Sequence, residues 1–321
     1  MKIVILDGYT TNPGDISWAP FEALGELHVY DYTAPDEIFR RLSGVSLCLT
    51  NKTCFPKEVL EKLPDLRYIG CLSTGFNVVD VEYCRNHGIT VTNIPEYATF
   101  ATAQMTIALL LEIAGKAGHH SDLVHQGVWT KNRDFCFWDG NLTELWGKTI
   151  GLFGFGKIAS RVSRIASALG MRVLACRRSE ITDEMRRADP QVTFVDEETL
   201  WKESDILSFH CPLTSETTGL VNSETISKMK DGVILLNTSR GPVLDEKAVA
   251  DALHSGKVAA LGADVVSIEP IRETNPLLSA PNTILTPHIA WAPKETRLRL
   301  IDVASSNLHS YLCGNPVNVV S

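Results

Sequence analysis

The sequence predicts an α/β protein built from two doubly wound parallel sheets, with a cleft between them. Short β-branched runs alternate with helical stretches from the first residue onward, and this alternation is typical of a parallel sheet with helices on both faces. A second strand–helix series begins at Thr149 with a glycine-rich turn, so about half of the chain precedes it. At 321 residues the chain also exceeds the size at which one hydrophobic core keeps growing.

The first series supplies the strands of one predicted sheet. They are expected at Lys2–Leu6, His28–Tyr30, Val45–Leu49, Arg67–Leu72 and Ile89–Thr92. Crossover helices are expected between them, at Pro35–Leu42, Pro56–Leu63 and Val79–Asn86, with Gly44, Pro64 and Gly88 marking helix ends. One long helical segment is then predicted from Thr99 to about His125, and an aromatic and polar loop follows from Trp129 to Gly140.

The second series supplies the other sheet. After the strand at Thr149, its strands are expected at Val173–Cys176, Ile206–His210, Val233–Asn237, Val258–Asp264 and Thr283–Thr286. Pro293 is predicted to open a last helix at a first-turn position, where its missing N–H costs nothing. No strand follows this helix, so we expect it to return to the first domain. The predicted domains are 1–100 plus 293–321, and 101–292, and ligands favour the cleft between two such domains.

Composition excludes several classes of protein. The net charge of −8 and the pI near 5.6 argue against nucleic-acid binding, which would require a basic face. Met1–Gly8 resembles a strand ending in a turn rather than a signal peptide. The longest apolar run, Met105–Ala114, is shorter than the ~20 residues that a membrane-spanning helix needs. We therefore expect a cytoplasmic protein with no nucleic-acid or membrane partner.

No metal site is expected. The eight cysteines are scattered without a Cys-x-x-Cys pair, a pattern that indicates reduced, mostly buried thiols. His119, His120 and His125 share a predicted helix, but they lack a cluster of carboxylates or cysteines and are interpreted as surface or interface residues.

The glycine-rich turn from Thr149 to Ala159 predicts a dinucleotide site. Gly154 permits a tight turn, Gly156 lets the backbone approach a pyrophosphate, and the helix starting near Lys157 directs its N–H groups at the anion. Ala159 occupies the third small position, where close helix–strand packing is needed. The residues predicted to contact the dinucleotide here are Gly154, Phe155, Gly156, Lys157 and Ile158.

The end of the next strand bears on which dinucleotide binds. The strand ending at Cys176 is followed by Arg177, Arg178 and Ser179, where an NAD site would place an acid that holds the ribose. Two guanidinium groups and a hydroxyl suit a 2′-phosphate. The alternative interpretation is that both arginines are solvated surface residues that stack on adenine or contact nothing. We favour NADP(H) over NAD(H).

Three titratable residues follow three successive strands. Arg240 lies in Asn237–Gly241, Glu269 in Asp264–Pro270 and His288 in Thr286–Trp291. Open α/β sheets bind ligands at this carboxyl edge. An arginine grips a carboxylate, a histidine exchanges a proton with a carbonyl oxygen, and an acid orients the imidazole and favours its charged form. This set suits reduction of a 2-keto acid, although each residue alone has a structural interpretation as an ion pair, a helix cap or a loop residue.

These motifs resemble those of the D-isomer-specific 2-hydroxyacid dehydrogenases, within which the glycerate dehydrogenase (hydroxypyruvate reductase) group is most similar. The resemblance spans essentially the whole chain. It rests on the glycine turn and on Ser73–Asp80, Asn93–Pro95, Cys211–Thr214, Asn237–Gly241, Asp264–Pro270 and Pro287–Trp291. It implies a flavodoxin-like substrate-binding domain, a Rossmann dinucleotide-binding domain, and a homodimer built through the nucleotide domains.

The resemblance also implies roles for individual residues. Arg240 would bind substrate, Glu269 would orient the acid–base His288, and Ser73, Thr74 and Gly75 would meet the substrate carboxylate through backbone N–H groups. The remaining cofactor contacts would come from Cys211, Pro212, Thr217, Thr238 and Asp264. Trp291 could line the substrate pocket and Trp138 could reach a partner subunit, although ordinary packing explains both equally well.

The implied activity is reduction of hydroxypyruvate or glyoxylate to D-glycerate or glycolate with a nicotinamide cofactor. Two alternatives stay open: a dehydrogenase for another small D-2-hydroxy acid, and a nucleotide-sensing scaffold, similar to corepressors of this fold, without significant turnover.

Overall fold

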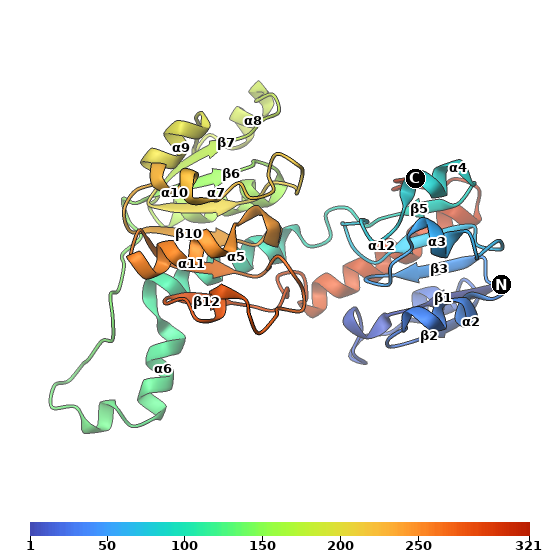
Figure 1. The fold of residues 1–321 in the computed structure, drawn as a ribbon, viewed down its shortest axis with the longest axis horizontal. Helices are drawn as coiled ribbons and strands as arrows, with labels where there is room; N and C mark the ends of the chain where they lie inside the picture. The colour runs from blue at the N-terminus through green and yellow to red at the C-terminus, as the bar shows by residue number, and fades with distance from the viewer. The chain divides into compact units, whose positions relative to one another are not determined.

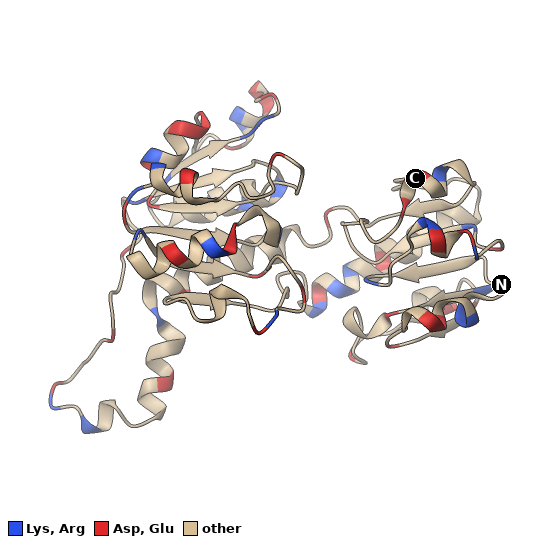
Figure 2. Cartoon of the chain, in the orientation of Figure 1, with Lys and Arg blue, Asp and Glu red and all other residues tan.

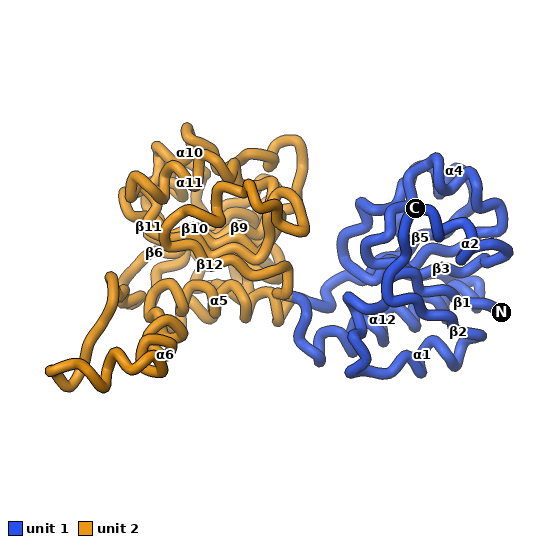
Figure 3. Tube along the Cα trace, turned by 60° about the horizontal axis from the view of Figure 1, so that its bottom comes forward, with its two compact units in different colours: residues 1–98, 291–321 blue, residues 99–290 orange.

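A computed structural model describes residues 1–321, which form two compact units. Unit 1 comprises Met1–Ala98 and Trp291–Ser321, and unit 2 comprises Thr99–Ala290 (Figure 3). Unit 1 is discontinuous because the last helix, α12 (Lys294–Leu312), packs in its core through Leu300, Ile301 and Leu308. The chain therefore passes between the units twice.

Unit 1 contains a five-stranded parallel sheet in the order β2-β1-β3-β4-β5, which is the flavodoxin-like order. Its strands are β1 (Lys2–Ile5), β2 (Glu26–Val29), β3 (Leu47–Thr50), β4 (Tyr68–Cys71) and β5 (Thr90–Thr92). One apolar cluster joins the sheet to α2 (Ile38–Leu42), α3 (Lys57–Leu60) and α4 (Val81–Asn86), and a second joins it to α1 (Ala19–Glu22) and α12. Helices therefore cover both faces of the sheet, as predicted.

Unit 2 contains a seven-stranded parallel sheet in the order β12-β11-β10-β9-β6-β7-β8. Its strands are β6 (Thr149–Phe153), β7 (Arg172–Cys176), β8 (Val192–Phe194), β9 (Ile206–Phe209), β10 (Val233–Asn237), β11 (Val258–Ala263) and β12 (Thr283–Leu285). From β8 through β7 and β6 to β9 the order is that of a Rossmann sheet, with the strand order reversing between β6 and β9. The predicted fold class is confirmed.

Helices cover both faces of the sheet of unit 2 as well. On one face α5 (Thr99–Gly115) and α7 (Lys157–Ala168) bury their apolar side chains. On the other face lie α9 (Glu197–Glu203), α10 (Ser223–Lys228) and α11 (Glu246–Ser255). The remaining short helix, α8 (Asp183–Ala188), joins β7 to β8. Figure 2 shows charged residues of both signs interspersed over the helices of each unit.

The prediction of one helix from Thr99 to about His125 was wrong. The first helix, α5, ends at Gly115, and Lys116 adopts a left-handed conformation with φ 47° before α6 (Ala117–His125) begins. Most of the apolar residues of α5 are buried, whereas none of α6 is, so no packing holds the two segments in line. In Figure 1 α6 and the segment after it stand away from the sheet of unit 2.

Two smaller details also differ from the expectations. Pro293 is the N-cap of α12 rather than a residue of its first turn, with extended backbone at ψ 144°. The edge strand β8 was not predicted, because its three residues are too few to show a clear apolar pattern. No helix is long and apolar enough to cross a membrane.

Candidate active site

The three titratable residues of the second series lie at one edge of the sheet of unit 2. Arg240 follows β10, Glu269 lies in the loop after β11, and His288 follows β12. These three strands are neighbours in the sheet and run parallel, so their carboxyl ends lie at the same edge. The sequence prediction that the three loops meet at one sheet edge is therefore consistent with the observed topology.

His288 and Glu269 form a hydrogen-bonded pair. Nδ1 of His288 lies 2.7 Å from Oε2 of Glu269, and the other carboxylate oxygen, Oε1, accepts a hydrogen bond from the backbone N–H of Val266 at 3.3 Å. The two side chains are about one-third exposed, at 33% and 32%. The acid thus fixes one ring nitrogen and leaves Nε2 available for proton exchange.

Asp264 fastens the loop that carries His288. This aspartate is only 1% exposed, and its carboxylate accepts hydrogen bonds from the Thr286 hydroxyl at 2.5 Å and from the backbone N–H groups of Ile289 and Ala290 at 2.9 and 2.8 Å. Its carbonyl oxygen accepts the N–H of His288 at 2.8 Å, and His288 has a left-handed φ of 54°. The predicted cofactor residue therefore holds the histidine loop, and its contact with a cofactor stays a prediction.

The loop that carries Arg240 is held by Asn237 and by a glycine. The Asn237 side chain accepts from the N–H and hydroxyl of Ser239 and donates to the carbonyl of Arg240 at 2.9 Å. A Cβ atom on Gly241 would lie 2.0 Å from the backbone carbon and oxygen of Val266, so the loops after β10 and β11 touch through their main chains. The Arg240 side chain itself is exposed and donates only to the Ser239 carbonyl.

In unit 1 the predicted substrate loop follows β4. The hydroxyl of Ser73 donates to the carbonyl of Gly75 at 2.5 Å, and that of Thr74 donates to the carbonyl of Ile94 at 2.7 Å. The backbone N–H groups of Thr74, Gly75 and Phe76 donate to no other group of the protein. Such a run of available N–H groups is suited to a small anion.

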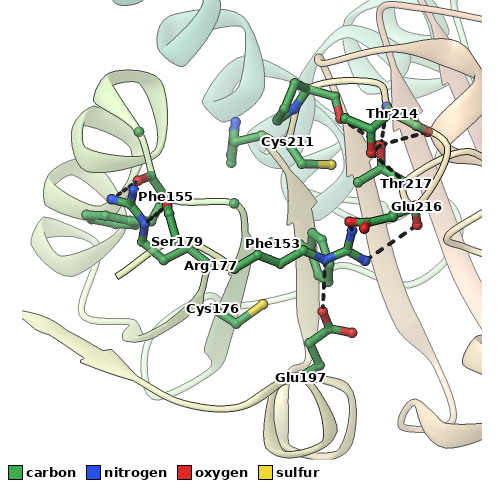
Figure 4. A pocket seen from close by; sticks show the side chains of 15 residues that line it. Phe153, Phe155, Cys176, Arg177, Ser179, Glu197, Cys211, Thr214, Glu216 and Thr217 are labelled. Atoms are coloured by element: carbon green, nitrogen blue, oxygen red, sulfur yellow. Dashed lines mark hydrogen bonds and ion pairs between the residues drawn. The ribbon is translucent and has the colours of Figure 1, made fainter. Parts of the chain in front are cut away.

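Unit 2 has a pocket of about 370 Å³ at the carboxyl ends of β6, β7 and β9 (Figure 4). Its walls include the predicted residues Gly154, Phe155, Gly156, Arg177, Arg178, Cys211, Pro212 and Thr217. The lining does not include four other predicted residues, Lys157, Ile158, Thr238 and Asp264. The hydroxyl groups of Thr238 and Thr106 are hydrogen-bonded to each other at 2.8 Å. Thr217 is buried and donates to the Pro212 carbonyl, which stabilises the loop after β9.

The two turn glycines have different surroundings. Gly154 has φ +84°, and a Cβ there would lie 2.8 Å from the backbone nitrogen of Cys211. A Cβ on Gly156 would meet nothing within 4 Å, and its φ of −119° suits any residue. The fold therefore requires glycine at 154 but not at 156. The open space at Gly156, next to the start of α7, fits the approach of a pyrophosphate.

The arginines after β7 are engaged differently. Arg177 donates to the Ser179 hydroxyl, the Phe155 carbonyl at 3.3 Å and the Met185 sulfur at 2.8 Å, and no carboxylate lies within 4.0 Å of it. Arg178 forms ion pairs with Glu216 and with Glu197. One of the two predicted phosphate-binding arginines is thus already held by carboxylates.

Among the pocket residues that sequence reasoning did not assign to the site are Glu197, Glu216 and His210. Glu197 opens α9 and Glu216 lies in a loop, where acidic residues are ordinary and carry no motif. His210 directly follows β9, and this position at the carboxyl edge of the sheet could have indicated a pocket residue. Burial lowers its pKa to about 4, and its Nε2 is hydrogen-bonded to the Ser208 hydroxyl at 2.9 Å. The imidazole is therefore neutral near pH 7.

The two tryptophans singled out in the sequence differ in exposure. Trp291 packs partly buried against the core of unit 1, whereas Trp138 is 69% exposed in the segment after α6. The eight cysteines are all free thiols, and no cluster of His, Cys, Asp or Glu is arranged for a metal ion.

Comparisons with known proteins show the family to which the chain belongs. Residues 107–290 match the family model of the D-isomer specific 2-hydroxyacid dehydrogenase NAD binding domain. The chain is 52% identical to a hydroxypyruvate reductase of Blautia hydrogenotrophica over the full length of both, and 35% identical to a glycerate dehydrogenase of Methylorubrum extorquens over 99% of this chain and 98% of that one. An acyclic imino acid reductase solved with NADPH and D-Arg is 29% identical, with a TM-score of 0.85 and complete coverage of both chains.

The fold and these similarities define an oxidoreductase that uses a nicotinamide cofactor. The chain belongs to the D-isomer-specific 2-hydroxyacid dehydrogenase family.

Proposed function

We propose that this protein reduces hydroxypyruvate to D-glycerate, and glyoxylate to glycolate, with NADP(H) used in preference to NAD(H). The observation that carries the proposal is the His288–Glu269 pair, at 2.7 Å, on the same sheet edge as Arg240 and the dinucleotide pocket. The similarity to a hydroxypyruvate reductase and a glycerate dehydrogenase supports this choice of substrate.

The proposed roles follow from the contacts of each residue. His288, protonated, donates a proton from Nε2 to the carbonyl oxygen of the substrate, while Glu269 holds Nδ1 and stabilises the positive charge. Arg240 binds the substrate carboxylate with its guanidinium group. For the loop after β4, the proposed role of the Ser73, Thr74 and Gly75 N–H groups is to meet a substrate carboxylate. A nicotinamide cofactor held in this unit would supply a hydride for the carbonyl carbon.

The cofactor is proposed to bind along the carboxyl edge of β6. Gly154, Phe155, Gly156, Lys157 and Ile158 would surround the pyrophosphate, with Cys211, Pro212 and Thr217 against the adenosine. Thr238 and Asp264 would lie toward the nicotinamide end. The preference for NADP(H) rests on Arg177 and Ser179, which offer a guanidinium and a hydroxyl with no competing carboxylate.

We further propose that the protein is a cytoplasmic homodimer. The segment after α6 exposes Trp129, Phe135 and Trp138, which are 48%, 88% and 69% exposed. Large apolar side chains grouped on a projecting segment are typical of a protein–protein interface.

A side-by-side assay tests the proposed function. NADPH and NADH are each mixed with hydroxypyruvate, glyoxylate and pyruvate, and oxidation is followed by absorbance. We expect turnover with hydroxypyruvate and glyoxylate, and a higher kcat/KM with NADPH. Cofactor binding without turnover of any 2-keto acid would support the scaffold alternative instead.

A further inference from the structure

The pocket at the end of β7 contains two neighbouring arginines whose charges are balanced differently. The guanidinium of Arg177 donates hydrogen bonds to the hydroxyl of Ser179, and Arg177 has no carboxylate partner. Arg178 lies between two acids that come from different parts of unit 2. Glu197 begins α9, and Glu216 lies in the loop after β9; Figure 4 shows them on different sides of the pocket.

Glu216 is the stronger of the two partners. Its carboxylate accepts a hydrogen bond from Nη1 of Arg178, and its backbone carbonyl lies 3.5 Å from Nη2. Glu197 is an ion-pair partner at 3.6 Å from Nε, without a hydrogen bond. The guanidinium of Arg178 is thereby directed toward the loop after β9, and its positive charge is offset by two negative ones.

We propose that Glu216 is a specificity-determining residue that withholds Arg178 from the 2′-phosphate of NADP(H). This inference rests on the proposed dinucleotide site. A 2′-phosphate at the end of β7 would compete with the Glu216 carboxylate for the same guanidinium donors. The phosphate is then recognised by Arg177 and Ser179 alone. As a result, the preference for NADP(H) over NAD(H) is smaller than it would be if both arginines bound the phosphate.

The Arg178–Glu216 ion pair competes only weakly with a phosphate, because both side chains are exposed to solvent. The side chains of Arg178 and Glu216 are 43% and 71% exposed, so solvent screens their attraction. Removal of the Glu216 charge should therefore release Arg178 without disturbing the core. NADH has no 2′-phosphate, so its affinity should not depend on this release.

The test is calorimetric titration of the full chain with NADPH and with NADH, in the absence of substrate. The variant Glu216→Gln keeps the size of the side chain and removes its charge. We expect its affinity for NADPH to rise about two- to fivefold, in line with the weak attraction in an exposed ion pair, and its affinity for NADH to stay unchanged. No change in the NADPH affinity, or an equal gain for both cofactors, would overturn the inference.

Two further variants make the test specific. Glu224→Gln removes the same charge from an exposed pair with Lys228 on α10, outside the pocket, and should change neither affinity. In the Arg178→Gln background, Glu216→Gln should not raise the affinity for NADPH. A rise in affinity there would mean that Glu216 repels the phosphate directly, and it would reject the role of Arg178. If the unmutated chain binds neither dinucleotide, the proposed site itself fails, whereas normal binding with an unchanged ratio rejects only the role of Glu216.

Discussion

At the scale of single residues, the site depends on carboxylates that hold other groups in place. Glu269 orients the ring of His288, and the Asp264 carboxylate holds the surrounding loop through two backbone N–H groups and the Thr286 hydroxyl. Neither Glu269 nor Asp264 needs to be accessible to solvent for these roles. The buried Asp264 therefore positions the histidine in a backbone conformation that few residues adopt unaided.

Replacement of the histidine tests its proposed role. His288→Gln should lower kcat for hydroxypyruvate reduction by about 100-fold or more, since a positioned acid–base contributes that much. The affinity for NADPH should not change, because His288 is proposed to exchange its proton with the substrate and not with the dinucleotide. Steady-state kinetics and calorimetry check the two statements. His125→Gln, on the exposed α6, is the control, and unchanged turnover in His288→Gln would remove the histidine from the mechanism.

At the scale of elements, the turn between β6 and α7 contains one glycine that the fold requires, Gly154, and one that the ligand is proposed to require, Gly156. Gly154→Ala places a Cβ against the backbone of Cys211 at positive φ and should destabilise the protein by about 1–3 kcal/mol. Gly156→Ala meets no protein atom and should leave the melting temperature unchanged, yet weaken dinucleotide binding about tenfold by blocking the pyrophosphate. Thermal unfolding and NADPH titration of both variants check this. Normal binding by a folded Gly156→Ala protein would place the pyrophosphate elsewhere.

The strands and the loops that follow them could be predicted because their signals are local. A buried β-branched run ends at a polar residue, and parallel order then brings Arg240, Glu269 and His288 to one edge. The break at Lys116 and the partners of Arg178 could not be predicted in this way. The first depends on packing that α5 has and α6 lacks, and the second depends on loops that approach each other only in the folded chain.

At the scale of the whole molecule, the exposed aromatic segment after α6 bears on assembly. We expect light scattering to give the mass of a dimer, about twice the 35.3 kDa of the chain. Replacing Trp129, Phe135 and Trp138 together by serine should shift the protein toward the monomer, because this removes the apolar surface that would be buried. Replacing Tyr9 and Tyr32, exposed aromatics of unit 1, should not. A monomeric unmutated protein would contradict the proposal.

The main-chain contact at Gly241 has a consequence for engineering this protein. Because Gly241 lies against the backbone of Val266, no side chain fits between the two loops at this point, and an insertion beside it in one loop would displace the other. Libraries that aim at new substrates should therefore leave 237–241 and 264–269 at their present lengths.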